Sequence, residues 1–106
     1  MSPEAARFLQ ATAPLLERPD VGRSTMMGWP CLRVNTKFFA TFDRDTGDLV
    51  VKLPSSRVDQ LIADQHGGAF SPAGRRFREW VAIPVSAEGE WPAYLDEAIA
   101  FVAANG

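Results

Sequence analysis

Apolar residues recur at the three- to four-residue spacing of an amphipathic helix near both ends of the chain. The first such stretch is Pro3–Leu16, and Ser2 occupies the position of its N-cap. Because Pro14 removes a helical hydrogen bond, the pattern predicts a kink there or two short helices. The last stretch begins at Trp91, and Asn105-Gly106 forms a C-terminal stop signal.

The middle of the chain is rich in aromatic and β-branched residues, which favour strands. It follows a connection at Arg18–Gly22, and Asn35-Thr36 lies where the two-residue turn of a hairpin would fit. A short helix comes after the third run, with Ser56 and Asp59 at the spacing of a capping box. The predicted strands are Cys31–Val34, Lys37–Phe42, Asp48–Leu53 and Phe77–Val85, with a further short strand at Phe70 as an open alternative.

The resulting element order is α-β-β-β-α-β(-β)-α. Consecutive strands joined by tight turns must pair antiparallel, and the helices must then cover one face of the sheet. We therefore predict one α+β domain over residues 1–106. It is a two-layer sandwich with a mainly antiparallel sheet and helices on one face.

Strand alternation divides the sheet residues into two sets. The apolar set should face the helices and contains Leu32, Val34, Phe38, Ala40, Phe42, Leu49, Val51 and Leu53. The opposite set contains Cys31, Arg33, Lys37, Phe39, Thr41, Val50 and Lys52, and strict alternation adds Arg78, Trp80 and Ala82. Glu79 interrupts the inward set of the last strand, so a bulge or a register shift is an alternative there.

The second set predicts a basic face with interleaved aromatic rings. Such a face can bind single-stranded nucleic acid, with bases on the rings and phosphates on Arg and Lys. The alternatives are a protein or small-ligand partner, or burial of the apolar centre against the C-terminal segment or a second copy of the chain. The candidate residues are Arg33, Lys37, Phe39, Lys52, Arg75, Arg76, Arg78 and Trp80.

Composition narrows these alternatives. The 106 residues carry a net charge of −2, so any nucleic-acid binding should be weak and non-specific. The chain has one cysteine, Cys31, and one histidine, His66, too few for a structural zinc site. It contains no dinucleotide or P-loop fingerprint, so we expect no cofactor and no enzymatic activity. We expect no membrane association and a cytoplasmic location, because no apolar run is long enough to span a bilayer and no export signal is visible.

Four segments carry a resemblance to a known family. The first two are the run Met26–Ala40, which contains Gly28-Trp29-Pro30, and the later run Leu49–Val58. Phe70-Ser71-Pro72 and Glu79-Trp80-Val81 follow in the same order. This arrangement resembles the bacterial MmcQ/YjbR-like domains and the related TfoX/Sxy N-terminal domain, and it departs from them at Thr36, where the family usually has Gly. The resemblance implies the same fold and an accessory or regulatory role associated with DNA. It brings no catalytic residues with it.

Overall fold

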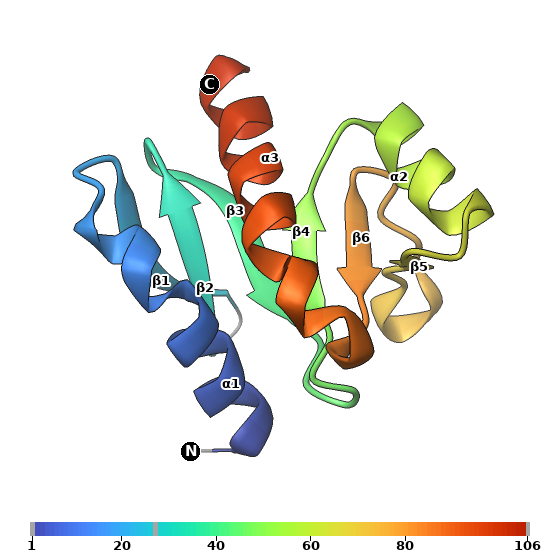
Figure 1. The fold of residues 1–106 in the computed structure, drawn as a ribbon, viewed down its shortest axis with the longest axis horizontal. Helices are drawn as coiled ribbons and strands as arrows, with labels where there is room; N and C mark the ends of the chain where they lie inside the picture. Colours follow the sequence, from blue (N-terminus) through green and yellow to red (C-terminus); the bar gives the residue numbers. More distant parts are fainter. Residues whose placement is uncertain (1, 27, 106) are drawn as a thin grey trace.

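Six strands form one antiparallel sheet in the computed structural model, which describes residues 2–26 and 28–105 (Figure 1). Their order across the sheet is β1-β2-β3-β4-β6-β5. The strands are β1 (Val21–Met26), β2 (Trp29–Val34), β3 (Lys37–Phe42), β4 (Leu49–Lys52), β5 (Gly68–Ala69) and β6 (Trp80–Ile83). Met27 and Gly106, on which parts of the sequence analysis fell, lie outside the described residues.

Three α-helices accompany the sheet: α1 (Pro3–Thr12), α2 (Ser55–Ala63) and α3 (Trp91–Ala104). The Ser2 cap is confirmed, because the backbone N–H of Ala5 donates to its Oγ at 3.1 Å. The break before Pro14 is also confirmed, since α1 gives way to the 3-10 helix η1 (Ala13–Glu17). The capping box at Ser56 is wrong, because α2 starts directly after Pro54 and no side chain caps it. Two further 3-10 helices are η2 (Pro72–Gly74) and η3 (Val85–Glu90).

The predicted α+β class and element order are confirmed, and β1 is an addition to them. The sequence analysis placed Arg18–Gly22 in a connection, yet β1 begins at Val21. Its sequence, Val-Gly-Arg-Ser-Thr-Met, has no apolar alternation, because it lies at the sheet edge with mostly exposed or half-buried side chains. Pairing along all six of its residues with β2 makes it a strand.

The three helices and one face of the sheet enclose a single hydrophobic core (Figure 1). Helix α3 crosses β3 and β4, and its apolar residues Trp91, Leu95 and Ile99 are buried there. Arg57 of α2 ties that helix to α3 through Glu97, with Nε–Oε1 at 2.6 Å and Nη2–Oε2 at 3.4 Å. Among the described residues, none of the helices is long and apolar enough to cross a bilayer.

A β-bulge in β3 corrects the predicted faces. Leu32 of β2 pairs with Ala40, whereas the next residue, Arg33, pairs with Phe38. Phe39 is therefore the extra residue of the bulge, and it is fully buried in the core. Cross-strand partners share a face, so Phe38 joins Arg33 on the face without helices, opposite to the prediction. Lys37 shares the face of its partner Val34, which is also opposite to the prediction.

The face that the helices leave uncovered is called the open face below. The strand registers assign to it Arg33, Phe38, Thr41, Val50, Lys52, Trp80 and Ala82. Trp29 and Cys31 belong to it by alternation along β2. Cys31, Thr41 and Val50 are buried, while Trp29, Phe38 and Trp80 keep part of their rings exposed. On the open face, therefore, small side chains are buried and the larger aromatic side chains are partly exposed to solvent.

The β2–β3 turn holds a strained residue. Asn35 and Thr36 have φ of +50° and +72°, as a type I′ turn requires at both central positions. The left-handed conformation costs an L-residue roughly 1–2 kcal/mol. Asn accepts it better than other residues, whereas β-branched Thr is a clear outlier.

We expect Thr36→Gly to raise the free energy of unfolding by about 0.5–1 kcal/mol, the relieved strain minus the larger chain entropy of Gly in the unfolded state. Urea unfolding followed by circular dichroism measures the change. Asn35→Gly in the same turn is the matched control and should stabilise less. Equal stabilisation by both changes, or a lower free energy of unfolding for Thr36→Gly, would contradict the assignment of strain to Thr36.

Candidate functional site

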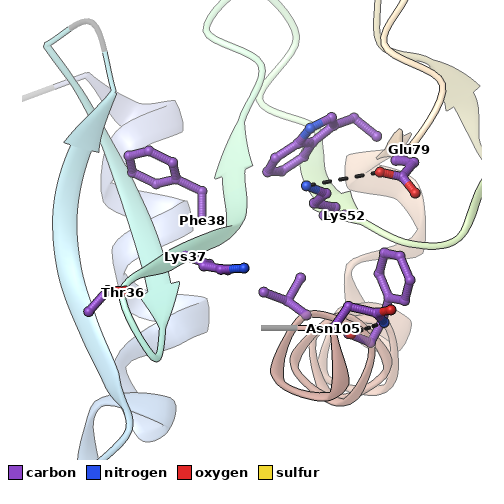
Figure 2. Close-up of a pocket in the computed structure, with 9 residues that line it drawn as sticks. Thr36, Lys37, Phe38, Lys52, Glu79 and Asn105 are labelled. Carbon is purple, nitrogen blue, oxygen red and sulfur yellow. Dashed lines mark hydrogen bonds and ion pairs between the residues drawn. The ribbon is translucent and has the colours of Figure 1, made fainter.

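A pocket opens where β3 and β4 stop pairing (Figure 2). The β3–β4 ladder ends at Ala40 and Val51, although β3 extends to Lys37 and β4 to Lys52. The bulge at Phe39 explains this end, because it shifts the first residues of β3 out of register. The resulting space, the strand-gap pocket, has a volume of about 610 Å³. Its lining is Thr36, Lys37, Phe38, Lys52, Glu79, Trp80, Phe101, Val102 and Asn105.

The walls of the strand-gap pocket come from elements far apart in the sequence. Figure 2 shows Lys37 and Phe38 of β3 on one side, with Lys52 and Glu79 across from them. The last turns of α3 and its C-cap residue, Asn105, form the remaining wall. No single sequence motif could have announced this site, because it depends on the end of a strand pair and on the placement of a helix.

A second, smaller hollow of about 340 Å³ adjoins the first and is called the basic hollow. Its lining is Lys52, Arg75, Arg76, Phe77, Arg78, Glu79 and Trp80. Lys52, Glu79 and Trp80 line both spaces, so the two lie next to each other. The segment Arg75–Glu79 between η2 and β6 is exposed throughout, which keeps its charged ends in water.

Ion pairs occupy only two of the cations that line these spaces. Lys52 Nζ lies 4.0 Å from Glu79 Oε1, and Arg76 Nη2 lies 3.1 Å from Asp59 Oδ1. Both pairs are largely exposed, so each contributes little to stability. Within residues 2–26 and 28–105, Lys37, Arg75 and Arg78 have no ion pair. These three cations remain available to an anion.

Arginines lie against the partly exposed rings near the site. The guanidinium carbon of Arg33 is 4.4 Å from the centre of the Phe38 ring, and that of Arg75 is 5.4 Å from the Phe77 ring. Such stacking holds the guanidinium over the face of the ring. Arg33 Nε is buried and has no hydrogen-bond partner, so the stack is what holds that side chain. Arg44 and Trp29 form the same arrangement at 4.7 Å on residues that line neither pocket.

The structure brings together most of the residues predicted for the basic face. Trp80 lines both of these neighbouring spaces, and Arg33 lies next to them because it stacks on Phe38. Five predicted cations also line the spaces: Lys37, Lys52, Arg75, Arg76 and Arg78. The prediction was wrong for Phe39, which is fully buried in the core. Sequence reasoning missed Phe38, Phe77 and Phe101 as ring-bearing members. Strict alternation cannot reveal Phe38, because the bulge reverses its face.

Cys31 and His66 line neither of the two spaces. Burial raises the pKa of the Cys31 thiol, and this effect exceeds the opposing influence of the Arg33 charge and the Ser24 hydrogen bond. The thiol is buried, and its burial and its raised pKa both disfavour the reactive thiolate. His66 is exposed after α2. In the part of the chain that the structure describes, no three His, Cys, Asp or Glu side chains gather as metal ligands.

No protein-family model, curated protein or solved structure matches this chain. The geometry and charge of the two neighbouring spaces are therefore the observations from which a function can be inferred.

Proposed function

We propose that this chain is a non-catalytic module that binds nucleic acid through the strand-gap pocket and the basic hollow. One observation carries the proposal: five cations line the two spaces, and Glu79 is the only acidic residue among their lining residues. The whole chain has 13 acidic and 11 basic residues, so this segregation of charge is local. A phosphate backbone is the common ligand that offers several negative charges at short intervals.

The aromatic rings beside the cations favour nucleic acid over a simple anion. Trp80 belongs to both spaces, and Phe38 and Phe77 stand beside it with arginines against their faces. Single-stranded nucleic-acid sites combine stacking rings with cations that follow the backbone. The resemblance to MmcQ/YjbR-like and TfoX/Sxy N-terminal domains is consistent with an accessory role at DNA. We propose that this chain is a domain of that kind.

Self-association through the same surface is the less favourable alternative. A two-fold symmetric interface places the same patch of both copies together. Each copy would then bring five cations and one acidic residue, Glu79, to the interface. Such like charges repel, so an acidic or phosphate-bearing partner suits this surface better than a second copy of the chain.

We expect wild-type protein to bind a fluorescein-labelled oligonucleotide with a Kd of about 10⁻⁴–10⁻⁶ M at physiological salt. The slope of log K against log salt should be roughly −2 to −3, for three or four phosphate contacts on a single strand. Fluorescence anisotropy in a salt series measures both. The variant Arg75→Ala/Arg78→Ala should lose at least about tenfold in affinity and flatten the slope, because it removes two phosphate contacts.

The variant Arg18→Ala/Arg23→Ala is the matched control. It makes the same change in net charge at residues that line neither space. It should therefore weaken binding much less. Absence of binding by wild-type protein at ~100 μM in ~50 mM salt, conditions that favour phosphate contacts, would overturn the proposed function.

A further inference from the structure

The strand-gap pocket offers aromatic rings from three different elements. Phe38 comes from β3, Trp80 from β6 and Phe101 from α3. The pocket is open on one side, and its volume of about 610 Å³ lies within the ~300–1,000 Å³ of clefts and cavities that bind small organic ligands. Flat rings at the walls suit a flat occupant, since bases stack on aromatic side chains whatever their sequence.

Cations on two sides of the pocket select an occupant that also carries negative charge. Lys37 points into the pocket from β3, and Lys52 faces it from β4 (Figure 2). The Lys52–Glu79 contact is long, 4.0 Å, and partly exposed, so a phosphate can replace Glu79 beside the ammonium group at small cost. A flat ring with an attached phosphate is the chemistry of a nucleotide.

The basic hollow extends the site beyond one nucleotide. It shares Lys52, Glu79 and Trp80 with the pocket, and its own lining includes Arg75 and Arg78. A mononucleotide that occupied the pocket alone would leave these two arginines without a phosphate. A nucleic-acid strand with one base in the pocket can place the neighbouring phosphates beside Arg75 and Arg78.

We infer that the strand-gap pocket receives one unpaired nucleobase of a bound strand, while the adjoining phosphates lie in the basic hollow. This inference rests on the proposed function and adds which part of the nucleic acid enters the protein. A base within a duplex is stacked and paired, and its extraction is unfavourable. The site therefore distinguishes single strands from duplexes.

Three fluorescein-labelled probes of about 12 nucleotides, within the ~4–16-nucleotide range of single-strand sites, test this inference by anisotropy. They are a mixed-sequence single strand, its blunt duplex, and an abasic single strand of the same length and charge. We expect the base-bearing single strand to bind at least about fivefold more tightly than the abasic strand, because only the former can stack on the rings. The duplex should also bind more weakly than the base-bearing strand.

Substitution of one ring at each end of the open face locates the effect. Trp80→Leu removes a ring from the pocket wall and should reduce the ratio between base-bearing and abasic strands to nearly one. Trp29→Leu is the matched control, because Trp29 is 37% exposed on the same face and lines neither space. It should leave the ratio unchanged. Circular dichroism checks folding, and Phe38→Leu serves as the second pocket variant if Trp80→Leu does not fold.

The outcomes separate this inference from the proposed function. Equal binding of base-bearing and abasic strands would overturn the pocket inference and leave phosphate binding in place. A preference for bases that survives both Trp80→Leu and Phe38→Leu, or that Trp29→Leu removes, would also overturn it. Absence of binding to all three probes would overturn the proposed function and the inference together.

Discussion

Replacement of Trp91 by alanine should lower the free energy of unfolding by about 3–5 kcal/mol, as for other buried aromatic residues. Trp91 is 1% exposed and begins α3, and its indole N–H donates to the carbonyl oxygen of Pro84 at 3.2 Å. It holds the first turn of α3 in the core and links it to Pro84, which lies between β6 and η3. The substitution leaves a cavity and removes the hydrogen bond. This loss is large, because the free energy of unfolding of a whole domain is only about 5–15 kcal/mol.

Urea unfolding of wild type and Trp91→Ala, followed by circular dichroism, measures this loss. Trp91→Phe keeps a ring in the core but removes the indole N–H together with the volume of the fused ring. It should cost less than Trp91→Ala, because most of the space stays filled and the carbonyl of Pro84 still accepts the backbone N–H of Ala87 at 2.9 Å. A loss below ~1 kcal/mol for Trp91→Ala would mean that α3 docks by another face.

Phe39→Ala and Phe38→Ala should have opposite consequences although the residues are neighbours. Phe39 is 0% exposed at the bulge and belongs to the core, so its removal should cost about 3–5 kcal/mol. Phe38 is half-buried on the open face, with Arg33 over its ring, and its loss should cost only ~1–2 kcal/mol.

Binding distinguishes the two residues in the reverse sense. Where Phe39→Ala remains folded, its affinity for a single-stranded oligonucleotide should stay close to that of wild type, because the ring does not reach the strand-gap pocket. Phe38→Ala should weaken binding by at least about fivefold through loss of stacking. Paired unfolding and anisotropy measurements on each variant test the assignment. If Phe39 proved to be the binding residue and Phe38 the structural one, the bulge register would be wrong.

Local rules were sufficient for much of the fold. Helical spacing located α1 and α3, Pro14 marked the break after α1, and tight turns implied antiparallel pairing. These features depend on residues within a few positions of one another, so sequence carries them directly. Edge strand β1 escaped this reasoning, because its pairing with β2 depends on backbone groups and leaves no apolar pattern.

Local sequence patterns also identified some residues of the candidate site. Arg75, Arg76 and Arg78 are close in sequence and exposed, so a local count of charges was enough to single them out. Trp80 followed from alternation along a regular strand, and its cross-strand partner Lys52 confirms their shared face.

The sequence by itself determined the α+β class, the element order after β1 and the grouping of basic residues near the last strand. The tertiary structure alone decided which of Phe38 and Phe39 is exposed, since one extra residue in a strand reverses every side chain beyond it. It also decided that β3 and β4 separate over the last turns of α3 to leave a pocket. Both depend on a register between strands, which backbone pairing and core packing select together and which no local pattern of side chains records.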